Sequence, residues 1–264
     1  MITADFHNHT TFCDGHADAE TMVKTAIEHG ITRLGLLMHS YTFFDESYCA
    51  KQDAAPKLQA EMAALKEKYR GQIELYCGVE QDYYSAESTA GFDYVIGSVH
   101  YVYKDGVYSS VDSGLAKAQA SVDTYFGGDW YAFAEEYFRT VADVAEKIKP
   151  NLIGHFDLVR KYNDSQPHFD EHHPRYVAAW KAAADRLVTY GIPFEVNLGG
   201  MFRAGQREPY PSLEQLRYLA QRGATVLLSG DCHTAENLRR GFDEWEEQVK
   251  ACGFTKDRWV DTII

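Results

Sequence analysis

Residues 19–39 read AETMVKTAIEHGITRLGLLMH. The first part of this stretch has the spacing of an amphipathic helix, which we expect over Ala19 to His29, and Gly30 follows where helices commonly end in a left-handed residue. The second part, Arg33 to Met38, is a short apolar run of strand length. A helix that leads into a short buried strand is the repeating unit of a mostly parallel α/β sheet.

The same alternation extends in both directions along the chain. Further glycines follow three other expected helices: Gly71, Gly191 and Gly223. The expected helices besides the first are Lys57 to Tyr69, Trp130 to Ile148, Pro174 to Tyr190 and Ser212 to Arg222. The expected strands are Ile2 to Phe6, Arg33 to Met38, Ile73 to Val79, Tyr94 to Val99, Asn151 to Gly154, Pro193 to Val196 and Thr225 to Ser229. These strands suffice to close or nearly close a barrel, so the sequence predicts one barrel-like α/β domain over residues 1–264.

One stretch does not follow the alternation. Tyr101 to Gly128 carries two glycines in its final turn and is expected to be a loop or lid region.

Composition limits the class of partner. The 264 residues include 26 basic and 39 acidic residues, a formal charge of −13, which disfavours binding to nucleic acid. The five cysteines are an odd number with no CxxC pair, so neither a disulfide framework nor a thiolate zinc knot is expected. No apolar run approaches membrane-span length, and the first residues lack the pattern of a secretory signal. We expect a cytoplasmic protein without membrane partners, and the sequence does not indicate an oligomeric state.

Nearly every expected strand is followed by a residue that can bind a metal ion. A single histidine at a strand end is more often a hydrogen-bonded structural residue than a ligand, but here the placement recurs along the chain. Because the carboxyl ends of the strands of a barrel meet on one face, these side chains should lie together. They are His7, His9, His39, Glu80, His100, His155, Asp231 and His233.

The spacing and number of these residues indicate more than one ion. In His7-Asn8-His9 and in Asp231-Cys232-His233, a period of two puts both side chains on the same side of an extended segment. One ion uses three or four protein ligands, and the set exceeds that number. We therefore expect two or three divalent ions, with zinc, manganese or iron suited to these donors. Glu80 is the natural bridge between ions, because a carboxylate has two oxygens to share.

Such a cluster predicts hydrolysis of a small phosphate ester without an organic cofactor, since the ions activate water and neutralise phosphoryl charge. Phosphate also needs cationic side chains. The candidates are Arg160, five residues after His155, and Arg203 in the loop after the sixth expected strand, with Arg207 further along. Asn197 ends that strand and is a candidate for a hydrogen bond to substrate or to a ligand.

The ordered series of motifs resembles the PHP (polymerase and histidinol phosphatase) superfamily, and within it the monofunctional histidinol-phosphate phosphatases. The resemblance spans Asp5 to His233. Three segments, GSVHYV, HFDLVRKYN and EPYPS, are similar to the phosphatase branch in particular. The motifs are DFHNHTTFCDGH (5–16), LMHS (37–40), GVEQD (78–82), IGSVH (96–100), IGHFDLVRKYN (153–163), FEVN (194–197), EPYPS (208–212) and SGDCH (229–233).

The resemblance implies a distorted (β/α)7 barrel of the TIM-like kind, a site with three metal ions, and hydrolysis of L-histidinol phosphate to L-histidinol and phosphate in histidine biosynthesis. The strand-end ligands match the family positions. CDGH departs from the family pattern, so either His16 or Asp14 completes the third ion's site, and His16 is the preferred choice. We expect a mechanism in which a hydroxide between two ions attacks phosphorus, the ions and Arg160 hold the non-bridging oxygens, and Asp231 or His233 protonates the leaving alkoxide.

Three rival functions remain open. One is a phosphoesterase of the same superfamily that acts on nucleotides or oligonucleotides, which the net acidity disfavours. A second is a non-catalytic metal-binding or polymerase-associated module, which would not need so many open ligands. A third, a C–N hydrolase related to amidohydrolases, lacks a lysine near a strand end.

Overall fold

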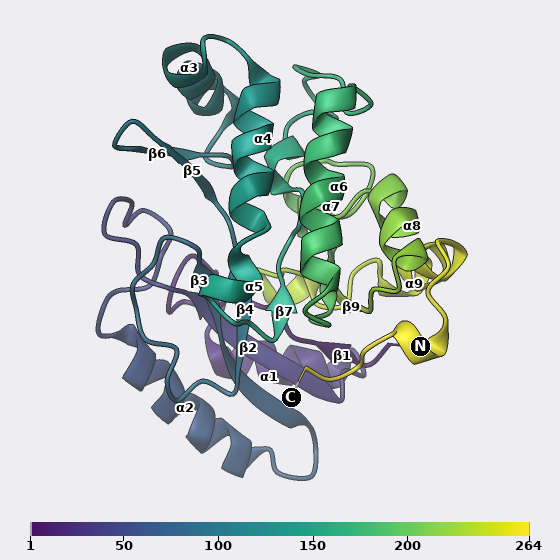
Figure 1. Ribbon diagram of the computed structural model, residues 1–264. Helices are drawn as coiled ribbons and strands as arrows, with labels where there is room; N and C mark the ends of the chain where they lie inside the picture. Colours follow the sequence, from purple (N-terminus) through teal and green to yellow (C-terminus); the bar gives the residue numbers. More distant parts are fainter. Residues whose placement is uncertain (1, 264) are drawn as a thin grey trace.

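The computed structural model describes residues 2–263, and within them seven parallel strands form one nearly closed sheet (Figure 1). Their order in the sheet is their order in the chain, and the register of β2 and β3 runs from Arg33↔Glu74 to His39↔Glu80. The expected strands are thereby confirmed. Their bounds are β1 Ala4–Asp5, β2 Arg33–His39, β3 Glu74–Asp82, β4 Tyr94–Ser98, β7 Leu152–Ile153, β8 Phe194–Asn197 and β9 Val226–Ser229.

The two ends of the sheet meet just beyond β1 and β9. Asn8 and Cys232 form an isolated parallel bridge, in which the amide of His9 donates to the carbonyl of Cys232 at 2.7 Å. The amide of Cys232 donates in turn to the carbonyl of His7 at 3.1 Å. The closure therefore lies at the carboxyl ends of the strands, which is the face where the candidate ligands stand.

Helices connect the strands and cover the sheet. In α1, Asp18 caps the start by accepting from the amide of Thr21 at 2.7 Å, and Gly30 follows the end with a φ of 75°. Four buried residues on one face of α1 pack against the sheet: Ala19, Met22, Val23 and Ala26. The helices are α1 Ala19–Glu28, α2 Ala54–Lys68, α3 Leu115–Phe126, α4 Trp130–Val141, α5 Val144–Lys147, α6 Pro174–Val188, α7 Gly199–Arg203, α8 Leu213–Gln221 and α9 Phe242–Ala251, with 3-10 turns at Leu158–Arg160, Ala235–Asn237 and Lys256–Arg258.

Tyr94 fills the space between neighbouring strands of the sheet. Its hydroxyl donates to the carbonyl of Phe6 at 2.6 Å, and its ring lies against the backbone of β2 and β3. A Cβ at Gly35 or Gly78 would come within 2.3 or 2.2 Å of Tyr94 atoms, so both positions require glycine. This close packing fixes the strands that carry His39 and Glu80.

The expectation of a loop or lid from Tyr101 to Gly128 is wrong. This stretch forms an antiparallel hairpin, β5 Tyr101–Lys104 and β6 Val107–Ser110, followed by α3. Figure 1 shows the hairpin and α3 at one end of the molecule, beside α4. Asp105 and Gly106 make the turn with φ of 51° and 84°, a conformation that Asp-Gly pairs favour.

The expected helix from Trp130 to Ile148 is divided into α4 and α5 at Asp143. The carboxylate of Asp143 accepts from the hydroxyl of Tyr83 at 2.9 Å and from Arg186 at 3.0 Å, so tertiary contacts decide this break. Helices α7 and α9 were not expected. No helix within residues 2–263 is long and apolar enough to cross a bilayer.

Candidate metal centre and pocket

The candidate ligands meet at the carboxyl ends of the strands, in three overlapping groups of histidines and carboxylates. The groups are His7, His9 and Glu80; His39, Glu80 and His100; and His9, Asp14, His39 and His233. All of these side chains are buried except that of Asp14, which is partly buried. Glu80 belongs to two groups, as a bridging carboxylate would.

The first group surrounds the Nε2 atom of His7. This atom lies 3.1 Å from Nε2 of His9 and 3.2 Å from Oε2 of Glu80. Oδ1 of Asp231 lies 3.6 Å from Nε2 of His7 and 3.5 Å from Nε2 of His9. Asp231 has a φ of 47°, so the backbone turns sharply to bring its carboxylate into the group.

The second group surrounds the carboxylate of Glu80, which is 1% exposed. Oε2 lies 3.0 Å from Nδ1 of His39, and Oε1 lies 3.3 Å from Nε2 of His100. Oε1 also lies 2.8 Å from Nε2 of His155. The third group surrounds Asp14, whose oxygens lie 3.8 Å from Nδ1 of His9, 3.6 Å from Nε2 of His39 and 3.3 Å from Nε2 of His233.

These spacings fit metal ions better than direct hydrogen bonds. Two imidazole nitrogens face each other in His7 and His9, and Oδ1 of Asp14 and Nε2 of His233 are buried without a hydrogen-bond partner. Donor atoms of a tetrahedral shell with metal bonds of about 2.0–2.1 Å lie roughly 3.3 Å apart. The observed separations scatter around this value, so the residues present can hold more than one divalent ion.

The electrostatics of the site also favour the binding of cations. Burial lowers the pKa of His7, but the carboxylates of Glu195, Asp231 and Glu80 raise it overall well above its ordinary value. Burial likewise lowers the pKa of His100, which Glu80 and Asp82 nevertheless raise to about 10. In the metal-free protein protons supply the missing charge, and divalent ions would displace them.

Carboxylates behind the ligands fix the orientation of the imidazole rings. Glu195 is fully buried and accepts from Nδ1 of His7 at 2.5 Å and from the amide of His155 at 2.8 Å. Asp82 accepts from Nδ1 of His100 at 3.1 Å. A ring held through one nitrogen presents the other to the ion, and such outer contacts strengthen metal binding. Sequence reasoning missed both residues, although Glu195 alternates with Asn197 at a strand end.

Asn197 supports the ligands and does not line the pocket. It is fully buried, and its amide group donates to Oε2 of Glu195 at 3.1 Å and to Oδ2 of Asp231 at 3.2 Å. Its carbonyl oxygen accepts from the amide of Gly199 at 2.8 Å. Asn197 thus contacts the candidate ligand Asp231 and does not line the cavity, so the expected contact of Asn197 with substrate is corrected.

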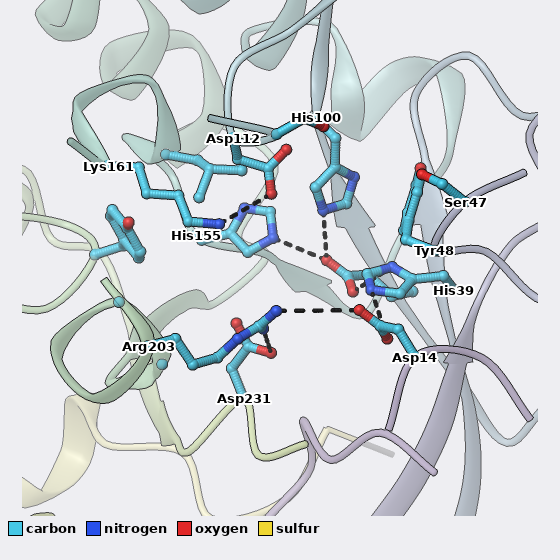
Figure 2. Close-up of a pocket in the computed structure, with 16 residues that line it drawn as sticks. Asp14, His39, Ser47, Tyr48, His100, Asp112, His155, Lys161, Arg203 and Asp231 are labelled. Atoms are coloured by element: carbon cyan, nitrogen blue, oxygen red, sulfur yellow. Dashed lines mark hydrogen bonds and ion pairs between the residues drawn. The ribbon is translucent and has the colours of Figure 1, made fainter. Parts of the chain in front are cut away.

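A cavity of about 200 Å³ opens above the ligands (Figure 2). Arg203, from α7, lines it as expected, with Nη1 3.0 Å from Nδ1 of His233 and 3.6 Å from Oδ1 of Asp231. Lys161 also lines it, with its ammonium 3.2 Å from Oδ2 of Asp112. Lys161 and Asp112 were missed, because Asp112 lies in the stretch without a recognised pattern.

Arg160 lies behind the pocket and not in it. Its side chain is 2% exposed, and Nε donates to Oδ2 of Asp157 at 2.6 Å. Nη2 donates to the carbonyls of Glu208, at 3.3 Å, and Pro209, and the guanidinium packs 5.3 Å from the ring centre of Tyr210. The 3-10 turn Leu158–Arg160 points this arginine back towards Asp157, so the expected phosphate contact of Arg160 is corrected to a buried structural role. Arg207 is 78% exposed and pairs with Asp164.

Asp14, and not His16, joins the third group. The carboxylate of Asp14 faces His9, His39 and His233, whereas the side chain of His16 is exposed and belongs to none of the groups found within residues 2–263. The amide of His16 donates to the carbonyl of His233 at 2.7 Å, and His16 lines a neighbouring pocket without joining a ligand group. The preference for His16 is therefore corrected in favour of Asp14.

Comparison with known proteins gives related sequences and folds. A protein of Deinococcus radiodurans named "Probable histidinol-phosphatase" is 26% identical over 261 residues, which cover 94% of this chain and 93% of that protein. The structure of HisK from Listeria monocytogenes aligns with a TM-score of 0.76 at 19% identity, covering 92% of this chain and 99% of that one. Histidinol phosphate phosphatase from Lactococcus lactis, solved with zinc, L-histidinol and phosphate, aligns with a TM-score of 0.72 at 18% identity and covers 96% of this chain and 94% of its own.

The two structural alignments show that the nearly closed parallel barrel is shared with these proteins. Residues 5–198 match the PHP domain family, and this span carries the first seven of the candidate ligands described above, from His7 to His155 with Asp14 included. The resemblance drawn from the motifs is thereby confirmed: the chain belongs to the PHP domain family.

Proposed function

We propose that the protein hydrolyses L-histidinol phosphate to L-histidinol and phosphate, with divalent ions held by the three ligand groups. The observation that carries this proposal is that members of all three ligand groups line one cavity together with two cations, Arg203 and Lys161. The names of the similar proteins from Deinococcus radiodurans and Lactococcus lactis support the choice of substrate.

Different side chains would bind the ions, hold the phosphate and position the imidazole rings. Zinc, manganese or iron ions, when bound, would lower the pKa of a water molecule and neutralise charge on the phosphoryl group. Arg203 and Lys161 hold the non-bridging oxygens of the phosphate, because both of these basic side chains line the cavity. Glu195 and Asp82 keep the imidazole rings in place during the reaction.

Asp231 and His233 act as ligands in this proposal, and the expectation that one of them protonates the leaving alkoxide is withdrawn. Burial raises the pKa of Asp231, but His7, His9 and Arg203 hold it well below its ordinary value, so the carboxylate has no proton to give near neutral pH. Burial and the nearby His9 lower the pKa of His233 to about 4, so its ring is neutral and suited to bind an ion.

Phosphate release from L-histidinol phosphate by protein loaded with manganese or zinc tests the proposal. Nucleotides, sugar phosphates and phenyl phosphate are measured beside it. We expect kcat/KM for L-histidinol phosphate to exceed that for phenyl phosphate by orders of magnitude. Equal rates with the two esters would leave the metal centre in place but reject the substrate, and preference for a nucleotide would favour the rival phosphoesterase function.

A further inference from the structure

Asp112 is an acidic residue in a cavity built for a phosphate ester, and it takes no part in the ligand groups. Glu80, Asp14 and Asp231 also line this cavity, but each of them lies among the imidazole nitrogens of the metal centre. Figure 2 shows Asp112 beside Lys161, with its carboxylate directed towards the space above His155 and His100.

The backbone holds Asp112 firmly at this place. It follows β6 in a turn where Oγ of Ser110 accepts from the amides of Asp112, at 3.3 Å, and Ser113, at 3.1 Å. The carbonyl of Asp112 accepts from the hydroxyl of Tyr162, and the amide of Val111 donates to the carbonyl of His100 at 3.0 Å. The carboxylate is therefore positioned relative to the metal centre before any substrate arrives.

The carboxylate is ionised and has acceptor capacity to spare. Burial raises its pKa, but Lys161 and His100 lower it overall to about 2. Oδ1 accepts from the hydroxyl of Ser110 at 3.0 Å and Oδ2 from the ammonium of Lys161 at 3.2 Å. A carboxylate has roughly four lone-pair positions, so further acceptor positions remain beyond these two donors.

A fixed negative charge in this cavity repels the phosphate of an ordinary substrate. The repulsion is offset when the alcohol part of the substrate carries a cation of its own, because the carboxylate then gains a partner in a partly dry site. We propose that Asp112 accepts the hydrogen bonds of an ammonium group on the alcohol part of the ester, so that the site selects phosphate monoesters of amino alcohols. This inference deepens the proposed function and rests on it for the reaction type.

The rival explanation is that Asp112 only holds Lys161 in place for the phosphate. The two explanations differ in which substrates suffer when the carboxylate is lost. If Asp112 binds ammonium, its loss affects only esters with an amino group. If it only positions Lys161, all phosphate esters lose the same factor.

The test pairs two substrates with two enzymes. L-Histidinol phosphate and its deamino analogue, 3-(imidazol-4-yl)propyl phosphate, differ only in the amino group, and kcat/KM for both is measured with the metal-loaded wild-type protein and with Asp112→Asn. Hydrogen bonds to charged groups are worth factors on the order of 10 to 100. We expect the wild type to prefer the amino substrate by such a factor, and Asp112→Asn to bring the ratio close to one. The ratio is internal to each enzyme, so partial misfolding cancels.

Two further variants complete the design. Asp105→Asn removes the same charge at an exposed position in the β5–β6 turn, where asparagine tolerates the φ of 51°, and the ratio should stay at the wild-type value. Lys161→Met takes away the neighbouring cation and should increase the preference for the amino substrate. This variant decides the question if Asp112→Asn does not fold.

The proposal is overturned if the wild type shows no preference within the pair, or if Asp112→Asn lowers both substrates equally. If neither imidazole ester is hydrolysed faster than phenyl phosphate, the proposed function fails by itself. The ratio is then measured with 2-aminoethyl phosphate and propyl phosphate, which differ by an ammonium in place of a methyl group. A wild-type preference for the ammonium ester that Asp112→Asn abolishes supports the ammonium site even then.

Discussion

Replacing Arg160 with methionine separates a structural role from phosphate binding. The change removes one partner of a fully buried ion pair and leaves Asp157, itself 0% exposed, without its cation. The carbonyls of Glu208 and Pro209 lose their donor as well. Breaking a buried pair from one side costs about 3–5 kcal/mol. Methionine keeps most of the aliphatic length of the side chain, but the contact of the guanidinium with Tyr210 is lost together with the charge.

The loss converts into a measurable shift of the unfolding midpoint. With roughly 2.1 cal/mol/K of unfolding entropy per residue, a chain of 264 residues has about 0.55 kcal/mol/K, so a loss of about 4 kcal/mol lowers Tm by roughly 7 °C. Calorimetry and urea unfolding of the metal-loaded protein measure this loss. Kinetics well below the lowered Tm should give a KM for phenyl phosphate within about threefold of the wild type.

Two further variants make the experiment decisive. Arg186→Met removes an arginine that is 42% exposed and pairs with Asp143 and Glu146 on the surface, and it should cost no more than about 1 kcal/mol. Combining Arg160→Met with Asp157→Asn should restore part of the stability, because no unpaired charge remains. An Arg160→Met protein with unchanged Tm and a KM raised tenfold or more would refute the structural assignment and return Arg160 to the phosphate.

Four other changes probe the metal centre and the phosphate clamp. Arg203→Met should lower kcat/KM for every phosphate ester by on the order of 100-fold. The Tm should change little, because the side chain of Arg203 is 42% exposed. A variant as active as the wild type would show that Arg203 does not hold the phosphate. Asp14→Asn should reduce the metal content by about one ion per chain in elemental analysis, whereas His16→Gln should not, and the reverse result would restore His16 as the ligand. Glu195→Gln should weaken metal binding by roughly 10- to 100-fold in competition with a chelator, while unchanged affinity would leave Glu195 without a positioning role. His100 has a folded pKa of about 10, above its ordinary value of 6.5, so its stabilising effect is full below pH 6.5 and is lost as pH rises through 10. Chelator-treated protein should therefore unfold at lower urea near pH 9 than near pH 6, and a metal-loaded sample should lose less.

Much of the fold follows from local pattern. The strand Arg33–His39 is a mostly apolar run that ends in a candidate ligand, and most of the other parallel strands also lead into a polar residue of the site. The hairpin of β5 and β6 could also have been predicted from the sequence, because Asp105-Gly106 between two alternating segments is a hairpin signal. The break between α4 and α5 could not be predicted from the sequence, since it depends on contacts of Asp143 with residues distant in the chain.

The candidate site likewise contains residues that the sequence could predict and residues that it could not. Ligands at strand ends could be found, because the barrel brings all such ends to one face whatever the loops do. Arg160 and His16 were misplaced because their side-chain directions depend on turns within the loops, which periodicity does not describe. Asp112 and Lys161 come from separate loops that meet only in three dimensions, so neither segment marks the pair by itself.

The closure of the sheet beyond β1 and β9 also sets the point in synthesis at which the full set of candidate ligands can come together. The carboxylate of Asp5 accepts from the amide of Gly230, a contact that spans 225 positions of the chain, and Cys232 is hydrogen-bonded to both His7 and His9. A chain still on the ribosome lacks the second half of this seam until Gly230 and the residues after it have left the exit tunnel. The contacts that bring Asp231 and His233 beside His7 and His9 therefore form only after nearly the whole chain has been synthesised.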